Sequence, residues 1–301
     1  MCLHCTRRHT CHNSYLVLQQ RSLYNKHMKN SINKEESSII LGVGDVHGHW
    51  DYLAQYMKQI KSYYGRLDGV ICAGDAEALR NETDLRGVNG PVKYRTLGTF
   101  PQVMDGTISL VAPVWFIGGN HEPYPELDKH GPGKWGPNVV YLGRSGIAEI
   151  LGMRVAYLSG IYSPKVSEGK AMDRHSPKER SYWVKDELEN LIKQGKKHHI
   201  DLLVTHDWPT HLGVDRNQNP TGNADMERLC LKLRPTMYIC GHMHHRESSF
   251  LHNTRIEALA HICSMEKACF VFSYTGKELC PLPVPPLQLK FPDKNTLEIE
   301  N

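Results

Sequence analysis

The segment Val111-Ala-Pro-Val-Trp-Phe-Ile-Gly-Gly-Asn-His-Glu-Pro-Tyr124 decides the fold, because it joins an apolar run directly to a group of polar residues. Residues 114–117 have the length and the β-branched and aromatic composition of a buried strand. Two glycines then allow a tight turn, and Asn120 and His121 follow at once. A strand that ends on such residues predicts a ligand site at its carboxyl end.

Four other stretches end in the same way. The apolar run that opens at Ile39 stops at Gly44-Asp45, and the run at residues 69–73 stops at Gly74-Asp75. Between them, residues 50–64 place apolar side chains at helical spacing. Strand, helix and strand in this order form a βαβ unit, which predicts parallel pairing. The polar residues that follow the five strand ends are Asp45, His47, Asp75, Asn120, His121, His206, His242 and His244.

The alternation of strands and helices continues along the chain. It predicts an α/β fold, a β-sandwich of mixed sheets flanked by helices. Further strands are expected at residues 139–142, 154–158, 201–205, 237–240, 255–259 and 269–274, and helices at 178–193 and 223–233.

Composition divides the chain into three parts. Residues 1–37 are expected to form a disordered basic leader, whose composition is also compatible with an organelle transit segment. Residues 38–275 form the expected globular domain, and residues 276–301 a proline-rich C-terminal tail. The leader contains Cys2, Cys5 and Cys11, but their spacing does not match a structural zinc site.

Charge and hydropathy exclude several classes of protein. The net charge of +4 equals the charge of the first 36 residues alone, which argues against a broad basic surface but leaves room for a local phosphate site. No apolar run approaches the roughly 18 residues of a membrane span. The nine cysteines lie mostly inside apolar runs, which predicts buried thiols and an intracellular protein, cytoplasmic or nuclear.

The polar residues at the strand ends are typical metal ligands. Carboxylates, imidazoles and one amide oxygen suit two divalent ions such as Mn, Fe, Zn or Ni. Ions about 3.5–4 Å apart need a shared ligand, and a carboxylate such as Asp75 can bridge them. Each element alone has a plainer explanation, since Gly-Asp is common in turns and a single His is often structural. Five such strand ends together favour one metal centre.

These elements resemble, in order, the five signatures of the calcineurin-like metallophosphoesterases: Gly44-Asp45-Val46-His47-Gly48, Gly74-Asp75, Gly119-Asn120-His121-Glu122, His206 and Gly241-His242-Met243-His244. The resemblance implies a metallophosphoesterase-type β-sandwich that hydrolyses phosphate esters with a hydroxide bridging two metals. It assigns Asp45, His47, Asp75 and His244 to one ion and Asp75, Asn120, His206 and His242 to the other. It also makes His121 the acid beside the leaving-group oxygen.

Segments around these motifs are similar to the RNA lariat debranching enzymes, which hydrolyse the 2′-5′ phosphodiester of branched RNA. They include residues 80–86, 93–100, 135–143 and 158–162. The resemblance implies a phosphodiester substrate, here branched RNA, and places Arg80, Arg86, Trp135 and Tyr162 at it. Asp45 departs from that pattern, because debranching enzymes commonly carry Cys there. They also usually have a longer C-terminal domain.

Several alternatives stay open. The chain could be another calcineurin-like phosphatase or a nucleotide phosphodiesterase with the same metal chemistry, or a non-catalytic scaffold for protein binding. His121 could orient Asn120 instead of donating a proton. Arg80 and Arg86 could be solvated surface charges, and Trp135 and Tyr162 could belong to the core. The sequence predicts no oligomeric state.

Overall fold

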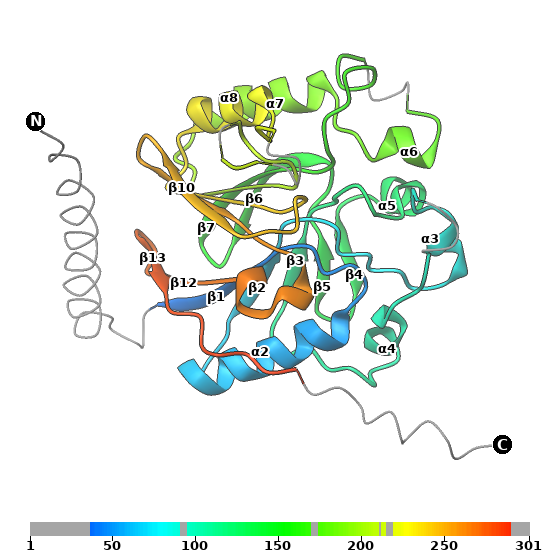
Figure 1. Ribbon diagram of the computed structural model, residues 1–301, viewed down its shortest axis with the longest axis vertical. Helices are drawn as coiled ribbons and strands as arrows, with labels where there is room; N and C mark the ends of the chain where they lie inside the picture. The colour runs from blue at the N-terminus through cyan, green and yellow to red at the C-terminus, as the bar shows by residue number, and fades with distance from the viewer. Residues whose placement is uncertain (1–36, 91–94, 170–173, 211, 215–218, 290–301) are drawn as a thin grey trace, which may run out of the picture. The chain divides into compact units, whose positions relative to one another are not determined.

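The computed structural model describes residues 37–90, 95–169, 174–210, 212–214 and 219–289. The chain divides into Met1–Ser37 and Ser38–Asn301. The predicted leader, residues 1–37, therefore lies outside the described residues except for Ser37. Within the second unit, two β-sheets pack face to face (Figure 1).

The first sheet has seven strands in the order β13-β12-β1-β2-β3-β5-β4. Its parallel centre consists of β1, β2, β3 and β5, and antiparallel strands flank it on both sides. The bounds are β1 (Ser38–Val43), β2 (Gly69–Cys72), β3 (Val114–Phe116), β4 (Gly133–Gly136), β5 (Val139–Tyr141), β12 (Cys269–Tyr274) and β13 (Leu279–Leu282).

The second sheet has six strands in the order β10-β11-β9-β8-β7-β6. Its four central strands are parallel, and β10 and β6 pair antiparallel at the two edges. The bounds are β6 (Ser145–Ile150), β7 (Met153–Leu158), β8 (Leu202–Thr205), β9 (Met237–Cys240), β10 (Glu247–Leu251) and β11 (Thr254–Ala258). The predicted α/β sandwich of mixed sheets is confirmed.

Three layers of apolar side chains hold the sandwich together. Between the sheets, residues such as Ile71, Val204 and Ile239 are fully buried. Helix α2 (Trp50–Tyr64) covers the outer face of the first sheet, and α7 (Lys185–Gly195) and α8 (Ala224–Leu233) cover the second (Figure 1). Both sheets are thus buried on both faces, as their parallel centres require.

Helix α2 has the bounds that the helical spacing predicts, and its buried face carries Trp50, Leu53, Tyr56, Met57 and Ile60. Gly65 ends the helix with a φ of 79°, a left-handed conformation that suits glycine. The shorter helices are α3 (Glu82–Arg86), α4 (Phe100–Met104), α5 (Tyr124–His130), α6 (Pro177–Arg180) and the 3₁₀ helix η3 (Ile262–Ala268). Among the described residues, no helix is long and apolar enough to cross a membrane.

The predicted helix at 178–193 is in fact two helices, α6 and α7. Between them the chain is extended, because Tyr182 pairs with Ile161 in a parallel bridge and Trp183 N–H donates to the Ile161 carbonyl. Trp183 is buried in the core under the second sheet. Burial of this indole therefore outweighs the helical propensity of the flanking residues.

The predicted proline-rich tail, residues 276–301, is described as far as residue 289. Within it, β13 extends the first sheet by pairing with β12. The backbone of Gln288 then exchanges two hydrogen bonds with the side chain of Gln59 on α2, at 2.8 and 2.9 Å. Leu287 is buried against the same helix layer.

The core between the sheets generates a prediction about stability. Ile239→Ala should lower the free energy of unfolding by about 2–5 kcal/mol, because the cavity has little room to collapse between two sheets. The matched control is Phe250→Ala on β10, which should cost less than about 1 kcal/mol because this ring is 67% exposed. Urea unfolding monitored by circular dichroism measures both, and equal losses would contradict the assignment of this core.

Candidate metal centre

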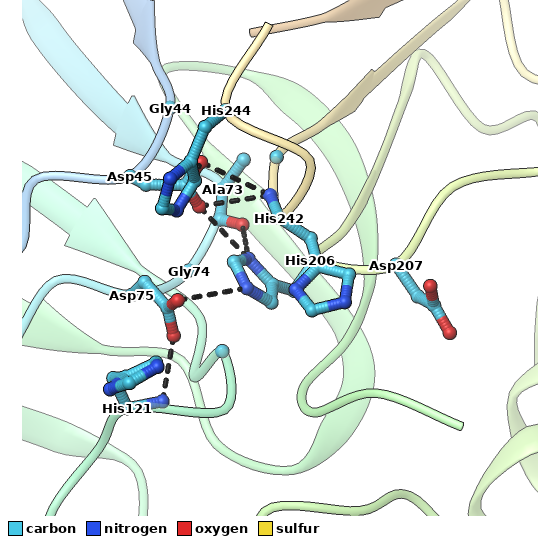
Figure 2. Close-up of polar contacts among 12 residues, drawn as sticks. Gly44, Asp45, Ala73, Gly74, Asp75, His121, His206, Asp207, His242 and His244 are labelled. Atoms are coloured by element: carbon cyan, nitrogen blue, oxygen red, sulfur yellow. Dashed lines mark hydrogen bonds and ion pairs between the residues drawn. The ribbon is translucent and has the colours of Figure 1, made fainter. Parts of the chain in front are cut away.

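The candidate ligands reach one place from both sheets. Asp45, Asp75 and Asn120 follow the carboxyl ends of β1, β2 and β3 in the first sheet. His206 follows β8 in the second sheet, and the segment with His242 and His244 follows β9. Figure 2 shows His206, His242 and His244 beside Asp45 and Asp75. The carboxyl ends of parallel strands thus meet where the two sheets face each other.

The first predicted ligand set is assembled in the structure. Asp45, His47, Asp75 and His244 each offer an atom within 4.8 Å of the others. His47 Nε2 lies 3.5 Å from Asp75 Oδ2 and 3.1 Å from His244 Nε2. Both carboxylates are buried, at 0 and 1% exposure. Two buried carboxylates facing two imidazoles are a donor set for a divalent cation.

The second predicted set contains two buried atoms without hydrogen-bond partners. When His206 is neutral, its Nδ1 donates to the Ala73 carbonyl at 2.8 Å and its Nε2 carries the lone pair. This Nε2 lies 3.3 Å from Asp75 Oδ2, yet neither it nor the buried Oδ1 of Asn120 is hydrogen-bonded to any described residue. Unpartnered buried acceptors are costly, and a cation ligated by both atoms would remove that cost. The residues present therefore suit a second ion.

His242, the remaining member of the second set, contacts the other candidate ligands through its ring and its backbone. Its ring centroid lies 5.0 Å from that of His206, and its backbone N–H donates to Asp45 Oδ1 at 2.9 Å. The backbone N–H of His121 likewise donates to Asp75 Oδ1, at 2.7 Å. Each carboxylate is thus held by an amide from another signature, which fixes the signatures relative to one another.

The electrostatics of the centre favour positive charge. Burial opposes the protonation of His206, but Asp75, Asp45 and the Ala73 carbonyl together outweigh it and raise the His206 pKa to about 10. Burial also opposes the protonation of His47, but Glu77 and Asp75 raise its pKa to about 9. Burial and the nearby His206 lower the pKa of His242 to about 3, so its ring keeps both lone-pair and donor functions at neutral pH. The carboxylates thus favour positive charge around them, and a divalent cation would take the place of the protons on His206 and His47.

The pKa values of Asp45 and Asp75 shift in opposite directions. Burial raises the pKa of Asp45, and the neighbouring Asp75 adds to this effect. Burial would also raise the pKa of Asp75, but His206 and His47 lower it well below its usual range. Like charges this close cannot both ionise easily without a compensating cation.

Several candidate ligands have a strained backbone conformation. His47, Asp75, His242 and His244 have φ values of 46°, 45°, 73° and 59°, in the left-handed region that residues other than glycine rarely adopt. Each such residue costs on the order of 1–3 kcal/mol, and such residues cluster at functional sites. The strained residues lie at the tight turns that direct the ligands inward.

Glu77 is a site residue that the sequence analysis missed. Its Oε1 lies 2.9 Å from Nδ1 of His47 and 3.5 Å from Nδ1 of His121. One carboxylate thus faces both a candidate metal ligand and the candidate acid, and His121 is 37% exposed beside it. The only sequence signal for Glu77 was its place two residues after Asp75.

Glu122 and Asp207, which adjoin the signatures, have structural contacts. Glu122 is buried and accepts the Ala76 N–H at 2.7 Å, and burial raises its pKa well above its usual range. Asp207 accepts the N–H of Tyr162 at 3.0 Å and points away from the centre (Figure 2).

A pocket of about 440 Å³ opens over the centre. Among its described lining residues is Arg95, whose Nε donates to the Gly90 carbonyl at 3.1 Å. A larger hollow of about 680 Å³ lies beside α8 and the β10–β11 turn, away from the candidate ligands. The residues that line the pocket over the centre are His47, His49, Glu77, Leu79, Leu85, Val88, Asn89, Gly90, Arg95, Thr96, His121, His244 and His261.

The four residues predicted to bind substrate do not line this pocket. Arg80 pairs with Asp84 at 2.8 Å and lies 3.6 Å from the ring centroid of Trp135, which is itself buried. Arg86 donates to the Thr83 hydroxyl at 3.0 Å. Tyr162 is half-buried, with its ring 5.5 Å from that of Trp183. Their roles toward a substrate stay predictions.

The family described as "Calcineurin-like phosphoesterase" matches residues 39–246. The chain belongs to the calcineurin-like phosphoesterase family. The predicted metallophosphoesterase is therefore confirmed at the level of the family, and metal dependence is general in it.

Among curated proteins, this phosphoesterase is similar to lariat debranching enzymes. It is 31% identical to that of Caenorhabditis briggsae over 241 residues, which cover 70% of this chain and 47% of the relative. It is 30% identical to that of Schizosaccharomyces pombe over 212 residues, which cover 64% and 46%. The chain spans about half the length of these relatives.

Among solved structures, a Thermus thermophilus protein, TT1561, has the same fold, with a TM-score of 0.50 and 11% identity. The match covers 82% of this chain and 99% of that one.

The close packing of glycine at the centre generates a prediction. A Cβ at residue 119 would lie 2.2 Å from Asp75 Oδ1 and 2.7 Å from His206 Nε2. Gly119→Ala should therefore displace ligands of both ions and cause the loss of most bound metal, measured by plasma mass spectrometry after gel filtration.

The matched control is Gly106→Ala. A Cβ there meets nothing within 4 Å, although its φ of 86° makes alanine strained. This variant should lose some stability and keep its metal. Full metal content in Gly119→Ala would refute the placement of Asp75 and His206 at one centre.

Proposed function

We propose that this chain is a metal-dependent phosphodiesterase of the RNA lariat debranching type, which hydrolyses the 2′-5′ phosphodiester of branched RNA in the cytoplasm or nucleus. The two unpartnered buried atoms, His206 Nε2 and Asn120 Oδ1, are the observation that carries the metal chemistry. The likeness to the debranching enzymes over 70% of the chain supports the substrate class.

In this proposal Asp75 is shared by two ions, since its Oδ2 faces both His47 and His206. Asp45, His47 and His244 complete one ligand set, and Asn120, His206 and His242 complete the other. When bound, two ions of the Mn, Fe, Zn or Ni type would lower the pKa of a water and neutralise charge on the phosphate oxygens.

His121 is the proposed general acid. It lies at the rim of the pocket, partly exposed, where a leaving-group oxygen can reach it. Its Nδ1 faces the Glu77 carboxylate, which favours a proton on Nδ1 and leaves Nε2 for the proton exchanged with the substrate. Glu77 orients His47 in the same way, so one carboxylate aligns a metal ligand with the acid.

Arg95 is the proposed phosphate-binding cation of the pocket. It is half-buried and lines the same pocket as His121 and His244. The hydrogen bond from its Nε to Gly90 fixes the guanidinium, and its terminal nitrogens, which make no hydrogen bond to the described part of the chain, could contact an anion.

Asp45 favours a second candidate, a phosphatase or nucleotide phosphodiesterase of the same family. With a buried carboxylate at this position, the first ion would have only nitrogen and oxygen ligands. Such a set suits general two-metal hydrolysis of phosphate esters and does not require a branched substrate.

Cleavage of synthetic RNA decides between the two. The protein loaded with Mn, Fe, Zn or Ni in turn should cleave a branched RNA at its 2′-5′ linkage at least 100-fold faster than a linear 3′-5′ RNA of the same length. Gel electrophoresis of end-labelled RNA separates the products. Equal cleavage of both RNAs, together with turnover of a nucleotide phosphodiester, would favour the second candidate, and bound metal without any hydrolysis would favour a scaffold.

Variants of His121 and Asp75 separate proton transfer from metal binding. His121→Ala should keep both ions and lose about 10²–10⁴-fold in kcat, because only the general acid is removed. Asp75→Asn should bind both ions poorly, because the shared carboxylate is gone. Metal analysis and single-turnover kinetics on the same preparations test this, and metal loss in His121→Ala would instead make His121 a residue that orients Asn120.

A further inference from the structure

His49, His261 and Cys263 form a further cluster of metal-ligating side chains next to the candidate pair. Each offers one ligand atom, and the three atoms lie within 4.8 Å of one another. His49 precedes α2, and His261 and Cys263 lie at the start of η3. None of the three belongs to the two ligand sets described above. Cys263 is exposed, whereas the sequence suggested a buried thiol.

A cation at this cluster would compete with one existing hydrogen bond. Nδ1 of His261 accepts the backbone N–H of Cys263 at 3.1 Å, so its lone pair points toward residue 263. Because Cys263 is exposed, water can take over that amide hydrogen when a cation binds Nδ1. The ring nitrogens of His49 make no hydrogen bond to any described residue, and the ring stacks on Tyr52 with centroids 5.0 Å apart.

The position of the cluster connects it to the pocket. His49 and His261 line the pocket together with His47, His121 and His244. The His261 ring stacks on that of His47, with centroids 4.9 Å apart and an angle of 17° between the planes. A cation held here would therefore be a direct neighbour of the candidate pair.

Two imidazoles and one thiolate are a donor set for zinc, and three protein ligands leave a fourth position open. We propose that His49, His261 and Cys263 bind a third divalent cation, zinc, whose open position takes a second phosphate group of a ligand in the pocket. On binding, a metal–sulfur bond forms and the thiol releases its proton to solvent. The binding of this cation does not depend on the reaction proposed above.

Cobalt is the probe that distinguishes this cluster from the pair. The proposed ligands of the pair contain no sulfur, so a thiolate-to-cobalt charge-transfer band in the near ultraviolet reports only a site with cysteine. Full-length protein stripped of metal and titrated with Co²⁺ should bind three equivalents and develop this band. A wild-type protein that binds cobalt without the band would overturn the proposal.

Cysteine variants locate the band. Cys263→Ser should abolish it and bind two equivalents of Co²⁺, which also shows that the variant is folded. His49→Gln should weaken the binding of the third equivalent at least tenfold. Cys280→Ser is the matched control, because Cys280 is a partly buried free thiol in β13. Cys280→Ser should keep the band. The triple variant Cys2→Ser, Cys5→Ser, Cys11→Ser should keep it as well. A band that persists in Cys263→Ser would overturn the proposal.

Discussion

The buried carboxylate of Asp75 is the group on which the rest of the centre depends. One of its oxygens accepts the His121 N–H, and the other faces both His47 and His206. These partners follow the ends of β1, β3 and β8, so one side chain contacts strand ends of both sheets. A carboxylate with 1% exposure is costly to bury unless it is compensated, and each contact around it supplies hydrogen bonds or positive charge.

The sandwich explains how strained residues persist around that carboxylate. His47, Asp75, His242 and His244 all adopt left-handed backbone conformations, which the turns alone would not maintain. The adjoining strands are fixed by parallel pairing and by the apolar layer between the sheets. Glycines next to the ligands let the turns approach each other, since a Cβ at Gly74 would lie 2.5 Å from His206 Nδ1. Rigid strands and small turn residues together determine where the ligands point.

The sequence predicted the parallel centre of the fold well, because β1, α2, β2, β3, β8 and β9 carry strong apolar patterns that end on polar residues. It predicted less of the edges. β6 and β10 have mostly half-buried or exposed residues, so their patterns are weak, and their pairing depends on neighbours distant in sequence. At the candidate metal centre, the sequence motifs identified side chains that the structure does bring together. The positions of Glu77 and of the cluster His49, His261 and Cys263 depend on the geometry of turns, which no local sequence pattern reveals. Arg80 and Trp135 interact with each other, and a contact of this kind is invisible before the tertiary structure is known.

The charge balance of the centre links metal binding to the stability of the fold. Asp45 and Asp75 are both buried; burial raises the pKa of Asp45, whereas His206 and His47 lower the pKa of Asp75, so the two carboxylates differ in how readily they ionise. A cation between them would allow both to ionise, and its binding energy would then stabilise the folded chain over the unfolded one, in which the ligands are far apart. Because the same carboxylates hold the His121 and His242 amides, the cation would also tighten the turns that carry the acid and the second ligand set. Metal binding would therefore also align the proposed catalytic group His121 with the second candidate ligand set.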